Sequence, residues 1–202
     1  MELILIRHGL PERSAETDDP PLSPEGREQA GRVARWLAGE RIEAVYSSPM
    51  VRARQTAEPF AAAAGHDVRL HEGVVEYDRG SGTYTPLEVL KREDYEAWKA
   101  FVAGGVGAEI AVFQGMVVAA LEEIIGGNRG RRVAVFCHGG VINVWTAHVL
   151  GMQPRLFFEP GYASVHRYLC AGSGERNVVA LNERAHLLDS WPALAEERAV
   201  AE

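Results

Sequence analysis

Two arginines and two histidines stand where they could handle a phosphate group. The apolar run at residues 1–6 ends in Arg7 and His8, and Gly9 follows. An arginine at the end of a buried strand needs an anionic partner, and its planar guanidinium matches two phosphate oxygens. Gly9 lets the backbone approach closely, and its carbonyl oxygen is predicted to hold one imidazole nitrogen of His8. The other nitrogen is then available as a nucleophile.

Two later segments carry matching chemistry. In "SSPMVRARQTA", residues 47–57, Arg52 falls in the first turn of a predicted helix, where the backbone already favours anions. Arg54 should point about 200° away from Arg52 on that helix, so it is expected outside the site. A second apolar run, "VAVF", leads through Cys137 to His138 and two glycines. Two arginines and a histidine can clamp a phosphoryl group without a metal.

Alternating strands and helices must position these side chains. The repeated order predicts an α/β fold, a three-layer α/β/α sandwich with a mostly parallel central sheet. Strands are expected at 1–6, 42–48, 66–77 (an edge strand and a connection), 133–137, 163–171 and 177–183, and helices at 22–40, 51–65, 87–102, 108–127 and 141–150. Ser23 and Pro24 suit the start of the first helix. Ligands sit beyond the carboxyl ends of strands in such sheets, so His8 and His138 are expected to face one crevice.

Composition narrows the class of protein. The 202 residues fit one domain, 1–202, with residues 79–130 as a lid or insertion region and 190–202 as a polar tail. A net charge of −7 argues against a nucleic-acid or membrane-surface partner, and the continuous apolar runs are too short to span a bilayer. With no signal-peptide pattern and with Cys137 and Cys170 read as reduced thiols, a cytoplasmic protein is expected. A homodimer stays open.

Three motifs together resemble a known family. "LIRHG", "SSPMVRARQTA" and "VFCHGG", in this order, are similar to those of the histidine phosphatase superfamily, with its phosphoglycerate mutase-like fold, and of its small phosphatase branch. "LSPEGREQA" and "LNERAHL" extend the resemblance over about residues 1–188. The resemblance implies that His8 attacks phosphorus and becomes a phosphohistidine, that Arg7 and Arg52 bind the phosphoryl oxygens, and that His138 donates to the same group. It implies no cofactor and no metal.

The resemblance also implies an acid that protonates the leaving oxygen and then activates water. "VEYDRG" makes Glu76 the best match, Glu72 fits poorly, and Asp78 is a weaker third candidate. The family's usual polar pair after the first motif is replaced by Leu10 and Pro11, a change that puts the substrate in doubt. Ser14 lies about where a phosphate-binding asparagine is usual, so it is a candidate phosphate ligand. Arg13 is a candidate for binding a substrate carboxylate.

The function expected is a phosphomonoesterase acting on a small phosphorylated metabolite. The alternatives are a phosphoglycerate mutase-type isomerase using the same residues, and a phosphate-binding module without catalysis. The acidic segment 87–101 with few arginines near it favours the phosphatase over the mutase. Tyr95 and Trp98 in this segment are expected near the substrate entrance. The remaining histidines, at 66, 71, 148, 166 and 186, are expected to be structural.

Overall fold

A single sheet organises the computed structural model, which describes residues 1–190 except 78, 81, 83 and 105–107. Its strand order is β3-β2-β4-β1-β5-β6. The strands are β1 (Glu2–Arg7), β2 (Ala44–Ser47), β3 (Val68–Leu70), β4 (Arg132–Cys137), β5 (Val165–Cys170) and β6 (Arg176–Glu183). The first four pair in parallel, and β5 runs antiparallel to both β1 and β6. The mostly parallel sheet is therefore confirmed.

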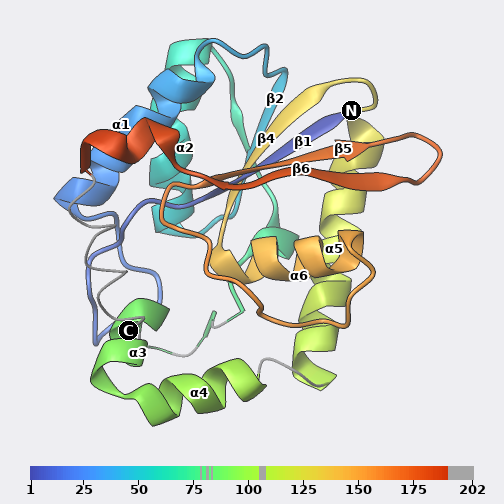
Figure 1. Ribbon diagram of the computed structural model, residues 1–202. Coiled ribbons are helices and arrows are strands. Elements are labelled where there is room, and N and C mark those ends of the chain that lie inside the picture. Colours follow the sequence, from blue (N-terminus) through green and yellow to red (C-terminus); the bar gives the residue numbers. More distant parts are fainter. Residues whose placement is uncertain (78, 81, 83, 105–107, 191–202) are drawn as a thin grey trace.

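Helices cover both faces of the sheet and complete the three layers (Figure 1). The helices α1 (Pro24–Leu37) and α2 (Val51–Ala64) pack on one face with Ile4 and Ile6 of β1. On the other face, α5 (Ala108–Gly127) and α6 (Gly139–Val149) pack with Leu3 and Leu5. Alternate residues of β1 thus enter opposite cores, which explains why the strand reads as one continuous apolar run.

The ends of the helices follow local sequence signals. Ser23 caps α1 by accepting a hydrogen bond from the backbone N–H of Gly26, and α2 ends at Gly65 in a left-handed conformation. Two short 3₁₀ helices, η1 (Glu72–Val74) and η2 (Ala185–Ser190), follow β3 and β6. Helix α6 begins at Gly139, two residues earlier than predicted, so that Gly139 and Gly140 belong to its first turn.

Helix α5 corrects one expectation from the sequence. The stretch Glu109–Gly127 is long and apolar enough to cross a membrane by length and composition, with a mean hydropathy of 1.6. The expectation that no segment is long enough to span a bilayer considered only continuous apolar runs. Helix α5 was not counted because polar residues interrupt its apolar sequence. One face of α5 lies in the core with α6, through Ile110, Val117 and Leu121. A core helix of a globular domain meets the same criterion.

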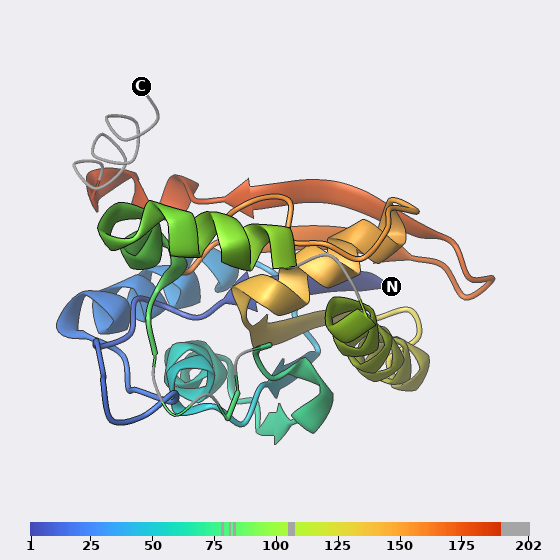
Figure 2. The same cartoon turned by 90° about the horizontal axis from the view of Figure 1, so that it is seen from below.

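The segment 87–102 forms two helices instead of the single helix predicted. Helix α3 (Leu87–Glu93) stops at Asp94, and α4 (Tyr95–Gly104) begins directly after it. Asp94 causes the break: its carboxylate accepts a hydrogen bond of 2.9 Å from the backbone N–H of Ala97, as at a helix N-terminus. Figure 2, seen from the end of the molecule where β1 and β4 finish, shows α3 and α4 lying across that end. The expected polar tail, 190–202, lies outside the described residues apart from its first member.

Candidate active site

His8 directly follows β1, and its backbone is bound to the segments on both sides of that strand. Its backbone N–H donates to the carbonyl of Cys137 (3.0 Å), and its carbonyl accepts from the N–H of Ala163 (3.1 Å). The ring Nδ1 lies 2.8 Å from the carbonyl oxygen of Gly9, so Nδ1 carries the proton and Nε2 keeps its lone pair. Burial, together with the charges of Arg52 and Arg7, holds the pKa of His8 well below its usual value of 6.5. The predicted role of the Gly9 carbonyl is confirmed in geometry, and the imidazole is neutral.

Gly9 is required by a close approach of two backbones. A Cβ at this position would lie 2.6 Å from the carbonyl oxygen of Gly26 in α1. The Gly9 N–H donates to the Thr56 hydroxyl (3.0 Å). The same hydroxyl donates to the carbonyl of Arg52 (2.7 Å). The loop that carries His8 is therefore bound to both α1 and α2.

The two arginines reach His8 from different sides. The Arg52 Nε–H donates to His8 Nε2 (3.3 Å), and its Nη1 donates to the carbonyl of Asp18 (2.9 Å). Arg7 donates through Nη1 to the carbonyl of Pro160. Both guanidinium groups are buried, as predicted, whereas Arg54 is exposed. Because Arg52 donates to the lone pair that would attack phosphorus, an arriving phosphate would take over that hydrogen bond.

His138 faces His8, with 5.1 Å between the ring centroids, and a serine sets its proton. The hydroxyl of Ser48 accepts from the N–H of Met50 (3.3 Å) and lies 2.8 Å from His138 Nε2. We assign the hydroxyl proton to the bond with Nε2, and the ring proton of neutral His138 then lies on Nδ1. Burial, with Arg52, His8 and Arg7 nearby, keeps the pKa of His138 well below 6.5. The sequence analysis missed Ser48, although two serines at a strand end were a visible signal.

Three buried nitrogen donors around His8 lack hydrogen-bond partners among the described residues. They are Arg7 Nε, Arg52 Nη2 and His138 Nδ1. Leaving a buried donor unpaired costs about 1–3 kcal/mol, more when it is charged. All three donors belong to side chains that lie close to His8, and a tetrahedral anion is the ligand that such a set of donors suits. We call Arg7, His8, Arg52 and His138 the phosphate floor.

Glu76 comes from the loop after η1, and its carboxylate reaches the N-terminus of α6, two residues beyond His138. Its Oε1 accepts hydrogen bonds from the backbone N–H of Gly140 (3.1 Å) and of Tyr77 (2.9 Å). A Cβ at residue 140 would overlap this carboxylate, so the glycine makes the contact possible. Glu72, by contrast, is exposed and pairs with Arg79 (2.6 Å), and the third candidate, Asp78, lies outside the described residues. The geometry favours Glu76 over Glu72.

The residues after Gly9 are used to position the loop. Ser14 Oγ accepts from the N–H groups of Glu16 and Thr17, both at 3.1 Å, so its assignment to phosphate stays a prediction. Arg13 is exposed and lies 3.6 Å from Glu93 of α3. The Leu10 N–H donates to the side chain of Gln29 (2.8 Å), and Pro11 is buried beside Leu22. Leu10 and Pro11 thus fasten the loop to α1.

Two tyrosines that the sequence analysis did not single out cover the arginines. The Tyr162 ring lies 3.9 Å from the Arg7 guanidinium carbon, and the Tyr84 ring lies 4.7 Å from that of Arg52. Tyr84 is buried, and burial raises the pKa of both hydroxyls. We call Tyr84, Tyr162 and helix α3 the roof. Tyr84 and Tyr162 lie in loops, where no periodic pattern of residues marks a functional side chain.

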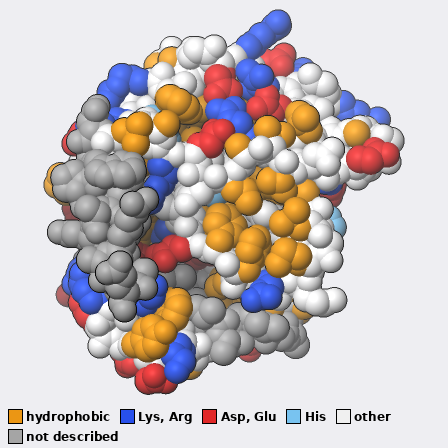
Figure 3. All heavy atoms as spheres, in the orientation of Figure 1, with side chains coloured by type: hydrophobic (Ala, Val, Ile, Leu, Met, Phe, Trp, Pro, Cys, Tyr) orange, Lys and Arg blue, Asp and Glu red, His pale blue; other side chains and the backbone are white. Residues whose placement is uncertain are grey.

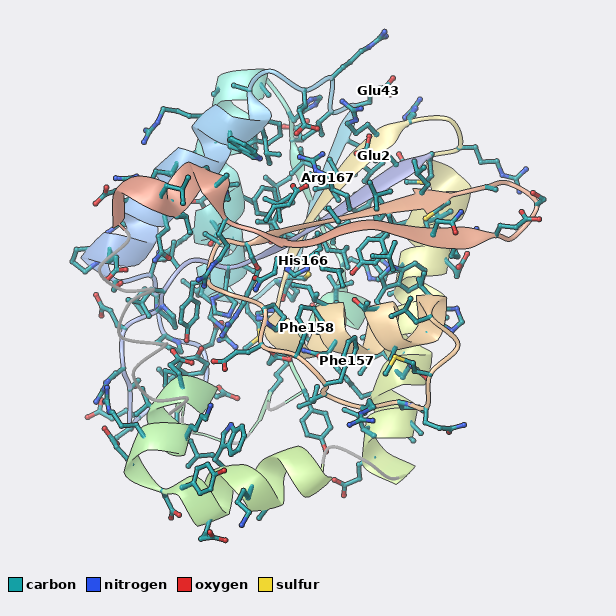
Figure 4. All side chains as sticks on the ribbon, viewed as in Figure 1. Glu2, Glu43, Phe157, Phe158, His166 and Arg167 are labelled. Atoms are coloured by element: carbon teal, nitrogen blue, oxygen red, sulfur yellow. The ribbon has the colours of Figure 1, made fainter. Side chains whose placement is uncertain are left out.

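Asn143 of α6 fixes the segment that leads to Tyr162. Its Oδ1 accepts from the N–H groups of Phe157 (2.9 Å) and Phe158 (3.2 Å), and its Nδ2 donates to the carbonyl of Phe158 (2.9 Å). Figure 4 shows both phenylalanines beside α6. Figure 3 shows apolar side chains gathered over α6 and the loop after it. The apolar cover of α6 therefore continues into the roof.

The other histidines have structural contacts. His166 lies between the Ser164 hydroxyl (2.8 Å) and the N–H of Asn182 (3.2 Å), and burial with the charge of Arg7 lowers its pKa to about 3. Figure 4 places His166 and Arg167 on opposite sides of β5. His186 lies 2.9 Å from the carbonyl of Ala163, beside Trp36. Within the described ranges, no three His, Cys, Asp or Glu side chains are grouped to hold a metal ion.

Comparison with known proteins agrees with this geometry. The profile of the histidine phosphatase superfamily (branch 1) matches residues 3–184. The chain belongs to the histidine phosphatase superfamily. Phosphoserine phosphatase 1 of Hydrogenobacter thermophilus is 29% identical over 93% of this chain and 94% of its own. Phosphoglycerate mutase-like protein 4 of Arabidopsis thaliana is 32% identical over 70% of this chain and 67% of its own.

A solved structure of this superfamily has the same fold. A variant of phosphoserine phosphatase from Entamoeba histolytica, in complex with phosphoserine, superimposes with a TM-score of 0.74 and 27% identity, covering 92% of this chain and 98% of its own. The expected family and fold are confirmed. The protein is a hydrolase of this superfamily, a small-metabolite phosphatase with a phosphoglycerate mutase-like fold.

Proposed function

We propose that the protein hydrolyses a small phosphomonoester through a phosphohistidine formed on His8. The observation that carries this proposal is the set of unpaired buried donors of Arg7, Arg52 and His138 around a neutral His8. A binding module needs donors but no nucleophile. Here His8 is neutral, and its Nε2 keeps a lone pair that accepts from Arg52 Nε at 3.3 Å.

In the first step, His8 Nε2 attacks phosphorus and the bond between phosphorus and the alcohol oxygen breaks. Arg7, Arg52 and the Nδ1–H of His138 stabilise the charge on the phosphoryl oxygens. Glu76 gives its proton to the departing alcohol oxygen. The Glu76 carboxylate lies at the N-terminus of α6, two residues beyond His138, and this position beside the phosphate floor supports the role.

In the second step, Glu76 takes a proton from water, and the water oxygen attacks the phosphohistidine. The bond from phosphorus to Nε2 breaks, inorganic phosphate leaves, and His8 is again neutral. The proton stays on Nδ1 and is donated to the Gly9 carbonyl oxygen throughout, so the ring needs no tautomer change. Both steps use only groups of this chain.

Hydrolysis of p-nitrophenyl phosphate tests the proposal. The wild-type protein is expected to release nitrophenol and to form an acid-labile, base-stable phosphoprotein after rapid quenching. His8→Ala should lose both, whereas His148→Ala, which changes an exposed histidine on α6, should keep both. Undiminished turnover in His8→Ala would exclude His8 as the nucleophile, and binding of phosphate without turnover by the wild type would favour the binding module.

The mutase alternative is tested with the same preparation. If 3-phosphoglycerate is isomerised faster than it is hydrolysed, the protein works as a mutase. We propose in addition that it acts in the cytoplasm, a proposal supported by the buried, unpaired thiols of Cys137 and Cys170.

A further inference from the structure

Glu88, in the first turn of α3, carries a carboxylate oxygen that no described residue satisfies. Its Oε2 is fully enclosed and has no hydrogen-bond donor among those residues. The side chain follows Tyr84 by four positions, and α3 lies across the end of the sheet where His8 sits (Figures 1 and 2). An enclosed carboxylate oxygen without a donor is costly, so a donor is expected from outside the chain.

The charge of Glu88 is felt by one floor arginine and by both tyrosines of the roof. Burial has the largest effect on these groups: it lowers the pKa of Arg7 and raises the pKa of Tyr84 and of Tyr162. The charge of the Glu88 carboxylate raises the pKa of all three groups. Its charge therefore acts on Arg7 and on both tyrosines of the roof. The Tyr84 ring covers Arg52 and the Tyr162 ring covers Arg7, so the groups on which the Glu88 charge acts are themselves in contact with the two arginines.

Charge balance then selects the chemistry of the substrate. A phosphate dianion matches the charges of Arg7 and Arg52, and Arg52 already has an ion pair with Asp19 at 3.4 Å. Glu88 is left as an additional negative group beside an anion, in an environment that screens charge poorly. A second anionic group on the substrate would be repelled, whereas an ammonium group would meet the carboxylate and the faces of the aromatic rings.

We infer that Glu88 is a specificity-determining residue that binds an ammonium group on the leaving alcohol of the substrate. The substrate class is a phosphomonoester of a small amino alcohol, and carboxylate-bearing phosphates without an ammonium group are disfavoured. This inference rests on the proposed function, since it places the ammonium group on the alcohol that Glu76 protonates.

Three phosphomonoesters of near-equal size test the inference. They are aminoethyl phosphate, hydroxyethyl phosphate and phosphoglycolate, which end in an ammonium, a hydroxyl and a carboxylate group. The wild type should prefer aminoethyl phosphate over phosphoglycolate by about tenfold or more in kcat/KM, as one charged hydrogen bond allows. In Glu88→Gln this ratio should fall about tenfold, and in Glu88→Lys it should invert.

Glu96→Gln is the matched control, because Glu96 has an exposed carboxylate on α4, outside the roof. It should leave the ratio unchanged. If Glu88→Gln lowers kcat/KM for all three esters equally, or leaves the ratio within twofold of wild type, Glu88 does not select the substrate. Such a result leaves the proposed function intact as long as the wild type hydrolyses p-nitrophenyl phosphate through His8. If that hydrolysis is absent, the proposed function itself fails.

Discussion

The phosphate floor and the roof are built in different ways. The floor side chains of Arg7, Arg52 and His138 follow strands directly or open the helix after one, and all are buried. The roof comes from loops and from a helix of seven residues. It is joined to the loop after β1 by an isolated bridge between Ser14 and Tyr84 and by the exposed pair of Arg13 and Glu93. We expect the side chains held by the sheet to carry out the phosphoryl transfer, and those of the roof to determine which substrate is accepted.

Removing a floor arginine should have the largest effect. Arg52→Ala is expected to lower kcat/KM for p-nitrophenyl phosphate more than about 10³-fold, because a buried charged donor to the phosphoryl group is lost. Arg54→Ala, which changes an exposed arginine two residues away, is the control and should stay near wild type. Similar losses of kcat/KM in both variants would mean that the substitutions act by disturbing α2, and not by removing the Arg52 guanidinium group.

Glu76 lies between floor and roof, and its effect should depend on the leaving group. Glu76→Gln should slow hydrolysis of an alkyl phosphate about 10²-fold, and that of p-nitrophenyl phosphate much less, because nitrophenolate leaves without a proton. Steady-state rates on the two esters measure the difference, with Glu72→Gln as the exposed control. An equal loss on both esters would show that Glu76 is not the acid.

Acid should destabilise the folded protein through its buried histidines. The pKa of His166 is about 3 in the folded protein against 6.5 when unfolded, so between these values the unfolded chain binds a proton that the folded chain does not. Stability is therefore lost as the pH falls below 6.5, and His166 accounts for about 2 kcal/mol of loss by pH 5. Urea unfolding at several pH values should show a flatter pH dependence in His166→Gln than in His148→Gln.

Ser48 should have a moderate effect, because it acts through His138. Ser48→Ala frees the ring proton of His138 to move to Nε2, and kcat should fall about tenfold. KM should change little if the arginines alone bind the ground state. Ser48→Thr keeps the hydroxyl and is expected to retain more activity than Ser48→Ala. If the two variants are equally impaired, the hydroxyl does not set the proton.

The weakest effect is expected at the tie between loop and roof. Arg13→Ala removes an exposed ion pair of 3.6 Å, which should change the free energy of unfolding by less than about 0.5 kcal/mol. Thermal unfolding and p-nitrophenyl phosphate turnover should both stay near wild type. A large loss of activity toward carboxylate-bearing esters alone would instead assign Arg13 to the substrate.

The sequence was informative about the floor for a physical reason. A buried strand that ends in Arg7 and His8 breaks the apolar pattern, and parallel strands bring their carboxyl ends together, so the distant His138 could be placed beside His8. The Gly9 carbonyl and the outward direction of Arg54 also followed from local geometry. Ser48 was missed because a serine at a strand end is usually an ordinary turn residue.

The roof was less predictable because tertiary contacts decide it. Tyr84 and Tyr162 are 78 residues apart in loops, and nothing local indicates that each covers an arginine. The break at Asp94 was missed since helix periodicity continues across it, and only the capping bond to Ala97 ends the register. The backbone at Leu10 and Pro11 is bound to Gln29 of α1 and to Leu22, and the bearing of these two residues on the substrate stays a prediction.

The contact between Gly9 and Gly26 bears on how this protein could acquire new substrates. A side chain at Gly9 meets the backbone of Gly26, and a side chain at Gly26 overlaps the backbone of Leu10, so neither change rescues the other. Random libraries that vary these two positions would yield mostly inactive clones. Variation in α3 and in the loops around Tyr84 and Tyr162 leaves this contact untouched. Adaptive changes toward other phosphomonoesters should therefore accumulate in the roof, while lineages keep the two glycines together.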